Sequence, residues 1–282
     1  MATLIDGKAV AKRIRAEITA EAERLPRKPG LAVILVGEDP ASCVYVRNKE
    51  KDCAECGFAS REYRMPDTAT EAELLSLINR LNGDGTVDGI LVQLPLPAHI
   101  DERRVIEAIA PDKDVDAFHP VNVGRMTAGV PSLLPCTPAG IMELLRAYDI
   151  DPAGKTCVVV SRSNIVGKPM GILLLRAHGT VIFCHSRTKD LAAMTRQADI
   201  LITAAGQRGL ITEDMIKEGA AVVDVAMNRD PDTGKFTGDV RFEEVERKAS
   251  FISPVPGGVG PMTRAILMRN ILTAAKEHMG IA

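Results

Sequence analysis

The sequence predicts an α/β protein of two domains, each built on a parallel sheet. Short apolar runs alternate along the chain with segments of helical periodicity, which is typical of parallel sheets covered by helices on both faces. The expected strands form two groups, separated by residues 111–138, which are rich in Pro, Asp, Gly and Thr. With 282 residues, of which 46% are hydrophobic, the chain is long enough for two cores. We therefore expect the ligand site in a cleft between the two domains.

The apolar runs and the turn residues that flank them place each element. The expected strands are 31–36, 60–64, 88–93, 156–160, 180–184, 199–203 and 220–225. The expected helices lie near 6–24, 40–57, 70–82, 101–109, 138–148, 168–178, 189–197, 212–218 and 262–279. The turn-rich segment from Asn228 to Phe236 predicts a hairpin. We expect a first domain over 1–120 and a second over 121–261, with a C-terminal helix, 262–282, that packs back on the first.

Composition excludes several classes of protein. The net charge is −2 and the basic residues are dispersed, so we expect no nucleic-acid partner. No apolar run is long enough to span a bilayer, and the first residues lack the apolar segment of a signal peptide, so we expect a cytoplasmic protein without a membrane partner. The six cysteines are then expected to be reduced. Cys53 and Cys56 form the only close pair, without a second pair to complete a site, so we expect no bound metal.

The first candidate site residue is Gln93. It follows the apolar run Ile90-Leu-Val92 and precedes a segment with two prolines, which cannot extend a strand's hydrogen-bond ladder. Ligands of open α/β sheets bind outside the carboxyl ends of the strands, so a side-chain amide at this point is suited to recognition or catalysis. The alternative is a polar residue that merely ends a strand, and this segment alone favours neither interpretation.

A tyrosine and a lysine stand on the helix expected after the first strand of this group. Tyr45 and Lys49 are four positions apart, so they share a helix face and can point into one space above the sheet edge. The alternative is an exposed helix with scattered charge, which the neighbouring Arg47 and Lys51 favour for any one of these residues.

An acidic loop, Pro111 to Pro120, carries carboxylates at alternate positions. It does not fit a calcium loop, because counting from Asp112 places Ala117 where glycine is needed and Val123 where glutamate is needed. The loop instead suggests one carboxylate that accepts hydrogen bonds from N–H groups of a ligand. His119 has no second ligand at metal-binding spacing, and we expect it to be a structural hydrogen-bonding residue.

The second group of strands begins with a candidate dinucleotide turn. A strand, the small-residue turn Ser161 to Gly167 and a helix start can present backbone N–H groups to a phosphate, although the turn has only one of the usual glycines. The next strand ends in His185-Ser-Arg-Thr188, where a site for NAD would carry an acid. Ser186, Arg187 and Arg162 instead favour NADP. Basic residues in ordinary surface loops remain the alternative.

Together these motifs resemble one family. They are Ile5-Asp-Gly-Lys, Tyr45-x-x-x-Lys49, the segments 88–97 and 111–120, Pro135-Cys-Thr-Pro138, Ser163-Asn-Ile-Val-Gly167 and the glycine-rich run from Pro256 to Thr263. Their order and content resemble bifunctional methylenetetrahydrofolate dehydrogenase/cyclohydrolase over nearly the whole chain. The resemblance implies a catalytic folate-binding domain followed by a Rossmann-type NADP-binding domain. It also implies a homodimer in one-carbon metabolism that oxidises 5,10-methylenetetrahydrofolate and hydrolyses the methenyl product to 10-formyltetrahydrofolate.

The resemblance also implies a role for each matched residue. Tyr45 would flank the pterin, Lys49 would be the catalytic cation with Gln93 as its hydrogen-bond partner, and Asp116 would bind the aminopyrimidine edge. The matched cofactor positions are Ser161, Arg162, Ser163, Ser186 and Met227, and the loop that closes over the substrate is matched by Pro256, Gly257 and Gly258.

Three positions depart from the family pattern. Ser161, Ala117 and Ala226 stand where the family has glycine, so we expect them to be disfavoured if the backbone there has a positive φ. Two other classes of function stay open from the residues alone. Short-chain dehydrogenases also carry a Tyr-x-x-x-Lys pair, but their nucleotide turn precedes it, whereas here the turn follows. A folate- or nucleotide-binding protein without catalysis is the other, and the presence of Lys49 argues against it.

Overall fold

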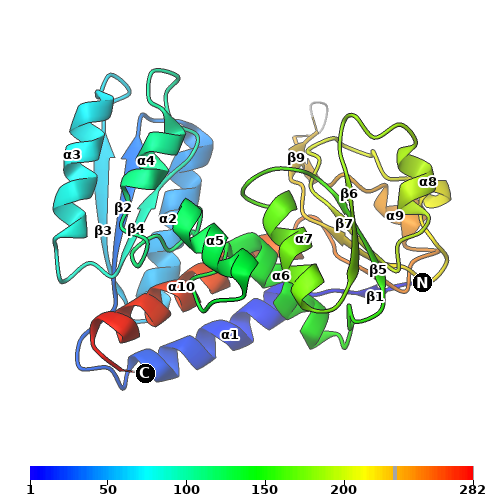
Figure 1. The fold of residues 1–282 in the computed structure, drawn as a ribbon, viewed down its shortest axis with the longest axis horizontal. Coiled ribbons are helices and arrows are strands. Elements are labelled where there is room, and N and C mark those ends of the chain that lie inside the picture. Colours follow the sequence, from blue (N-terminus) through cyan, green and yellow to red (C-terminus); the bar gives the residue numbers. More distant parts are fainter. Residues whose placement is uncertain (231–233, 282) are drawn as a thin grey trace. The chain divides into compact units, whose positions relative to one another are not determined.

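The computed structural model describes residues 1–230 and 234–281, and the chain forms two compact units (Figure 1). The three-stranded unit comprises Arg13–Cys136 and Arg264–Ala282, and the six-stranded unit comprises Met1–Lys12 and Thr137–Thr263. This division differs from the expected domain boundaries at residues 120 and 261. The first residues join the six-stranded unit because β1 (Thr3–Leu4) pairs with β11 (Phe251–Ile252). This pairing could not be predicted from the sequence, because a strand of two residues is too short to show an apolar periodicity.

The three-stranded unit is a parallel sheet covered by helices. Its strands are β3 (Ala59–Met65), β2 (Gly30–Val36) and β4 (Gly89–Val92), in the order β3-β2-β4. All residues of β2 and β4 are buried, which explains their unbroken apolar sequence. Its helices include α2 (Pro40–Glu55), α3 (Glu71–Asn82) and α4 (Glu102–Ala108).

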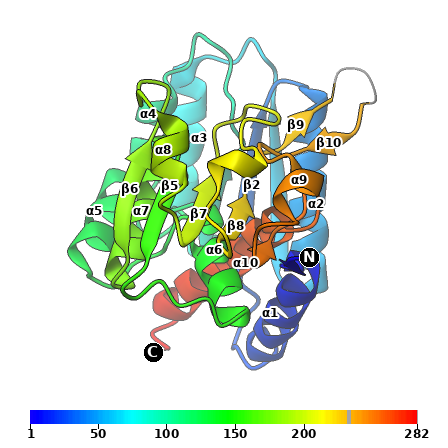
Figure 2. The same ribbon diagram turned by 90° about the vertical axis from the view of Figure 1, so that its right-hand side faces the viewer.

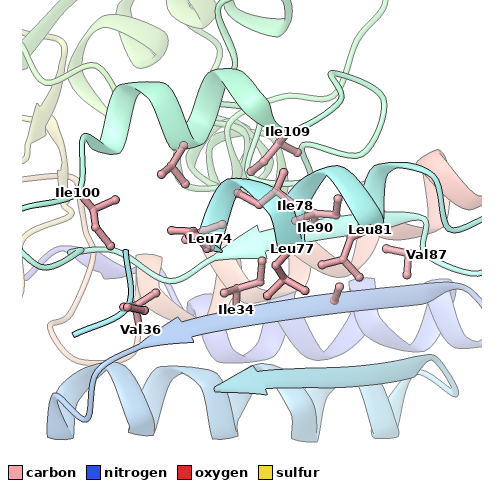
Figure 3. Close-up of a cluster of buried hydrophobic side chains, with 14 residues drawn as sticks. Ile34, Val36, Leu74, Leu77, Ile78, Leu81, Val87, Ile90, Ile100 and Ile109 are labelled. Carbon is pink, nitrogen blue, oxygen red and sulfur yellow. The ribbon is translucent and has the colours of Figure 1, made fainter. Parts of the chain in front are cut away.

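One face of this sheet packs against α3 and α4. A capping box between Thr70 and Glu73 begins α3, and leucine and isoleucine at positions 74, 77, 78 and 81 form its buried face. These side chains meet Ile34 and Ile90 of the sheet in a single apolar cluster (Figure 3). The cluster holds the carboxyl ends of β2 and β4 in a defined position, which matters because the candidate residues follow those ends.

A helix that the sequence analysis did not predict, α5 (Pro120–Ala128), lies within the stretch that separates the two groups of strands. Proline stands in its first turn, His119 Nδ1 accepts a hydrogen bond from the backbone N–H of Val121 (3.1 Å), and Gly129 ends it with φ 75°. The structural role expected for His119 is thus confirmed. The start and stop signals were present in the sequence, but the segment is only nine residues long and lies within a stretch rich in Pro, Asp, Gly and Thr.

Besides β1 and β11, the six-stranded unit contains β5 (Thr156–Val160), β6 (Thr180–Cys184), β7 (Ile200–Thr203) and β8 (Ala221–Asp224). The strand order is β1-β11-β8-β7-β5-β6, and every pairing in this sheet is parallel. Figure 2 shows β6, β5, β7 and β8 side by side. When β5, β6, β7, β8 and β11 are numbered 1 to 5 in chain order, they lie across the sheet in the order 2-1-3-4-5. The strand order therefore reverses between β5 and β7, and ligands of such sheets bind at this switch point.

Helices α6 (Cys136–Ala147), α7 (Gly167–Arg176), α8 (Leu191–Thr195), α9 (Phe242–Val245) and α10 (Val259–His278) complete the fold. The seven predicted strands are confirmed, and α1 (Gly7–Ala22) lies where a helix was predicted. The prediction of a helix over 212–218 is wrong, since only a 3₁₀ turn, Glu213–Met215, forms there. The predicted hairpin forms between β9 (Asn228–Arg229) and β10 (Phe236–Thr237), with residues 231–233 of its loop outside the described residues.

Of the three positions that depart from the family's glycines, only one has a positive φ. Ala117 has φ 58°, whereas the backbone of Ser161 and of Ala226 does not have a positive φ. The condition for a backbone cost is therefore met at Ala117 alone of the three, and no such cost arises at Ser161 or Ala226. No helix in the described residues is both long and apolar enough to cross a membrane.

Candidate active site and cofactor site

The candidate catalytic residues follow the carboxyl ends of β2 and β4 in the three-stranded unit. After β2 the Asp39 side chain accepts a hydrogen bond from the backbone N–H of Ser42 (2.8 Å), and Pro40 occupies the first helical turn. These signals begin α2 immediately above the sheet edge. As a result, Tyr45 and Lys49 lie on the helix that leaves the central strand, and Tyr45 is 44% exposed.

Lys49 and Gln93 are in direct contact. Lys49 Nζ donates a hydrogen bond to Gln93 Oε1 at 3.1 Å. The other end of the amide is also held, because Gln93 Nε2 donates to the carbonyl oxygen of Leu94 at 2.6 Å. The amide therefore presents its oxygen to the lysine, and a neutral acceptor can bind either the ammonium or the free amine.

Asp116 completes this cluster. Burial raises the pKa of its carboxyl, whereas the charge of Lys49 and a hydrogen bond with the Cys136 thiol lower it. Burial likewise raises the pKa of Cys136 well above its ordinary value, so the thiol stays protonated and able to donate. Cys136 was not among the candidate residues of the sequence analysis. The motif Pro135-Cys-Thr-Pro138 was noted for the family resemblance, but the proximity of its cysteine to Asp116 depends on the fold and leaves no local signal.

The loop that carries Asp116 is held against β4. A bridge between Ile90 and Asp114 extends the sheet, and a Cβ on Gly89 would lie 2.5 Å from the Val115 side chain, so glycine is needed there. The Asp114 carboxylate accepts hydrogen bonds from the backbone N–H of His119 (2.7 Å) and from Asn122 Nδ2 (3.0 Å). Burial raises the pKa of Asp114 to about 6. These contacts place Asp116 beside the end of the strand that leads to Gln93.

An ion pair also restrains α2. The Asp52 carboxylate is buried, at 1% exposure, and accepts two hydrogen bonds from the Arg264 guanidinium, which belongs to α10. Asp52 lies one helical turn after Lys49, so this bidentate pair restrains the part of α2 that carries the lysine.

The six-stranded unit contains a cavity of about 450 Å³ at the switch point between β5 and β7. Its walls include Ser161, Arg162 and Ser163 of the turn after β5, His185 and Ser186 after β6, and Ala204, Ala205 and Gln207 after β7. The Ser163 hydroxyl accepts from the backbone N–H groups of Val166 (3.2 Å) and Gly167 (3.1 Å). A Cβ on Gly167 would lie 2.6 Å from the Ser161 carbonyl, so this glycine allows the start of α7 to approach the turn closely.

The other predicted positions lie outside this wall. Arg187 is exposed, and its backbone N–H donates to His185 Nδ1 (3.1 Å), but its side chain is not part of the cavity lining. Met227 is 44% exposed in the segment after β8.

The glycine loop predicted to close over the substrate lies beside the start of α1. Pro256 is exposed, Gly257 has φ 122°, and a Cβ on Gly7 would lie 1.7 Å from the Gly258 carbonyl oxygen. The glycine loop therefore packs directly on the start of α1, which explains why the Ile5-Asp-Gly-Lys segment needs its glycine. Among the described residues, no group of three or more His, Cys, Asp or Glu could hold a metal ion.

The six-stranded unit has a Rossmann-type sheet with a cavity at its switch point, and the other α/β unit carries a lysine hydrogen-bonded to an amide, with a carboxylate near enough to respond to the lysine's charge. These features define a dinucleotide-dependent enzyme of two domains. Residues 5–116 match the catalytic domain, and residues 135–279 the NAD(P)-binding domain, of tetrahydrofolate dehydrogenase/cyclohydrolase. The chain therefore belongs to the tetrahydrofolate dehydrogenase/cyclohydrolase family.

Individual relatives agree with this assignment over their full length. The bifunctional protein FolD of Moorella thermoacetica is 57% identical over 279 residues, which cover 98% of this chain and 99% of the relative. The crystal structure of the bifunctional enzyme FolD from Campylobacter jejuni, a methylenetetrahydrofolate dehydrogenase/cyclohydrolase, has a TM-score of 0.97 at 52% identity and covers 98% of this chain and 99% of that one. The FolD of Trypanosoma brucei, solved with NADP and an inhibitor, has a TM-score of 0.94 at 41% identity, over 99% and 98% of the two chains. The predicted family and fold class are confirmed.

Proposed function

We propose that the protein oxidises 5,10-methylenetetrahydrofolate with NADP and hydrolyses the resulting methenyl compound to 10-formyltetrahydrofolate. Its relatives of more than half identity are named bifunctional FolD proteins, and they match this chain from end to end. The observation that carries the proposal is the contact between Lys49 and Gln93 at the carboxyl edge of the three-stranded sheet, with Asp116 close enough to respond to the lysine's charge. This set supplies both a proton-transfer group and an anionic binding group.

Asp116 is the proposed binding group for the substrate's pterin. A carboxylate can accept two N–H bonds from an aminopyrimidine edge, and such charge-assisted bidentate contacts are stronger than neutral ones. The charge of Lys49 and the Cys136 thiol both lower the pKa of this carboxyl and so favour the anionic form that binding requires. Tyr45, one helical turn before Lys49, offers a half-exposed aromatic ring that can lie against a flat pterin.

Lys49 is the proposed catalytic group of the hydrolytic step. A water molecule must lose a proton as its oxygen bonds to the methenyl carbon, and a ring nitrogen must gain one as its bond to that carbon breaks. The lysine can perform both transfers if it stays near the reacting atoms in its charged and its neutral form. Gln93 provides for this, because its oxygen accepts a hydrogen bond from either form without favouring the charge as a carboxylate would.

The cavity of the six-stranded unit fits NADP as the cofactor. Its turn from Ser161 to Ser163 and the start of α7 suit a phosphate, and the segment after β6 carries Ser186 where an acid would bind the 2′-hydroxyl of NAD. Arg162 lines the cavity and can pair with a 2′-phosphate. When bound, the cofactor would accept the hydride. The protein's own contribution to that step is to hold the donor carbon at a reactive distance.

A spectrophotometric assay tests the proposal. Purified protein is supplied with methylenetetrahydrofolate and either NADP or NAD, and then with preformed methenyltetrahydrofolate alone. We expect reduction of NADP in the first case and hydrolysis in the second. Oxidation of a simple alcohol instead would favour a short-chain dehydrogenase, and binding of both ligands without turnover would indicate a binding protein.

We further infer a homodimer and a cytoplasmic location. In the six-stranded sheet β6 is an edge strand, and Phe183 on it and Leu175 on the adjacent α7 are 41% and 58% exposed. An exposed apolar strand edge of this kind is suited to pairing with a second copy. Light scattering of the parent and of Phe183→Glu would test the dimer, and fractionation of cells that express the protein would test the location.

A further inference from the structure

We propose that Asp239 is a positioning residue for the nicotinamide half of the cofactor: its buried carboxylate clamps together the segments that follow β7 and β8. This inference rests on the proposed use of NADP. Asp239 is 0% exposed and stands outside every motif noted in the sequence. Its role is visible only in the contacts that converge on its two oxygens.

Each carboxylate oxygen of Asp239 accepts two hydrogen bonds. Oδ2 accepts from the Thr203 hydroxyl (2.9 Å) and the backbone N–H of Ala205 (2.7 Å). Oδ1 accepts from the backbone N–H of Gln207 (2.7 Å) and from Asn228 Nδ2 (3.1 Å). Thr203 is the last residue of β7, and Asn228 belongs to the segment after β8. One side chain therefore holds the segments that follow two neighbouring strands, β7 and β8.

The segment after β7 forms part of the candidate cofactor cavity. Ala205 and Gln207, whose backbone N–H groups Asp239 binds, line the cavity on the side opposite Ser186. In a Rossmann-type sheet the adenosine half of a dinucleotide lies over the first two strands, here β5 and β6, and the other half crosses the switch point. The loop held by Asp239 follows β7, beyond that switch point, so it lies where the nicotinamide half is expected.

Asp239 is itself held in place. The backbone N–H groups of Asp239 and Val240 donate to Asp224 Oδ1 (3.1 Å) and Oδ2 (2.8 Å), and Asp224 is the last residue of β8. A Cβ on Gly238 would lie 1.8 Å from Asp224 Oδ2, so only glycine allows this approach. Asp224 thus orients the segment that carries Asp239, and Asp239 orients the loop at the cavity.

Asp239→Asn is the sharpest test, because it keeps the shape but replaces one acceptor with a donor. The Thr203 hydroxyl can turn and the Asn228 amide can flip, but a backbone N–H cannot, so either Ala205 or Gln207 loses its partner. We expect the dissociation constant for NADP, measured by calorimetry, to rise about tenfold. Adenosine 2′,5′-bisphosphate, which carries only the adenosine part, should bind within about twofold of the parent.

Amide hydrogen exchange gives a second readout that needs no cofactor. In Asp239→Asn the amides of Ala205 and Gln207 should exchange faster than in the parent, while amides of β5 stay protected. Asp199→Asn is the matched control. The Asp199 carboxylate accepts a hydrogen bond from the backbone N–H of Thr156 (2.9 Å) at the amino end of the same sheet. Loss of this carboxylate should therefore change the affinity neither for NADP nor for the bisphosphate.

Asn228→Ala and Thr203→Val remove one donor each and leave the backbone bonds in place, so they keep the test available if Asp239→Asn does not fold. Both should weaken NADP binding less than the Asp239 variant. Equal weakening of NADP and of the bisphosphate, or unchanged NADP binding with unchanged exchange, would overturn the inference. If the parent fails to bind NADP, the proposed cofactor is wrong, and the exchange experiment still decides whether Asp239 holds the loop.

Discussion

At the scale of single residues, the candidate catalytic centre depends on one lysine whose neighbours are an amide and a carboxylate. Gln93 accepts a hydrogen bond from Lys49, and the carboxyl pKa of Asp116 responds to its charge. These partners have different consequences for a proton-transfer group. The amide tolerates both charge states of the lysine, whereas the carboxylate favours the ammonium.

Lys49→Gln should abolish hydrolysis more completely than it impairs substrate binding. General acid–base catalysis contributes about 10²- to 10⁴-fold, so we expect a loss of that size in the rate for supplied methenyltetrahydrofolate. Folate binding, measured by calorimetry, should remain detectable because Asp116 is unchanged. Hydrolysis at the parent rate would show that another group transfers the proton.

Asp116→Asn should weaken folate binding and spare the cofactor. The variant keeps the shape but loses the charge and turns one acceptor into a donor, so we expect a loss of about 2 to 3 kcal/mol in folate affinity. NADP affinity should stay within about twofold, because Asp116 and the cofactor cavity belong to different units. Calorimetric titration with each ligand separates the cases, and an equal loss for both would indicate misfolding instead.

At the scale of elements, the turn after β5 and the helix that follows it form the proposed site for the cofactor's charged part. Arg162 lies on the cavity wall, whereas Arg187 does not, although the sequence made the two equivalent. The backbone N–H of Arg187 donates to His185 Nδ1 within the turn after β6, and no local pattern distinguishes the direction of its side chain from that of Arg162.

Arg162→Ala should therefore raise the KM for NADP and reduce the preference for NADP over NAD. We expect a change of about tenfold at low ionic strength, and less at high salt because the side chain is exposed and screened. Hydrolysis of supplied methenyl substrate should be unaffected. Arg187→Ala is the matched control and should change the KM for NADP less. An unchanged preference for NADP over NAD in Arg162→Ala would show that Arg162 is an ordinary surface charge.

The end of α7 offers a test of local stability. His178 has φ 63° directly after the C-cap residue Ala177, and its backbone N–H donates to the Leu175 carbonyl (2.9 Å). Glycine is favoured at such a position. His178→Gly should raise the free energy of unfolding by about 0.5 to 1 kcal/mol, since the relief of the left-handed backbone exceeds the entropy lost. Urea unfolding measures this, and Ala177→Gly, at φ −87°, should instead destabilise.

At the scale of the whole molecule, buried carboxyl groups link stability to pH. Burial raises the pKa of Asp114 to about 6, above the ordinary 3.8. A raised carboxyl pKa means that the folded state binds the proton more tightly. The stabilisation from this group is therefore full below about pH 4 and is lost as the pH rises to about 6.

Asp114→Asn should remove this dependence. Both donors to the carboxylate, from His119 and Asn122, reach the same oxygen, Oδ2, which the amide oxygen can replace. Relative to the parent, the variant should gain up to about 3 kcal/mol in free energy of unfolding between pH 4 and pH 7. Asp199 has a lowered pKa because of its hydrogen bond with Lys217, so Asp199→Asn should show the opposite trend. A constant difference between parent and Asp114→Asn at all pH values would contradict the assignment.

The sequence by itself determined the features that depend on neighbours along the chain. The alternation of apolar runs and helical periods specified seven strands and the α/β class, and the four-residue spacing of Tyr45 and Lys49 placed them on one helix face. Gln93 could be singled out because prolines end its strand. These inferences succeed because backbone propensity, turn chemistry and burial periodicity act over a few residues.

Only the tertiary structure decided which distant residues meet. The pairing of β1 with β11 and the four hydrogen bonds to Asp239 each join residues more than ten positions apart in the chain, and some more than two hundred apart. Such contacts depend on the packing of whole sheets and helices, which fixes side chains that carry no local signal. For this reason the candidate binding and catalytic residues could be proposed from the sequence, whereas the residues that hold them in position could not.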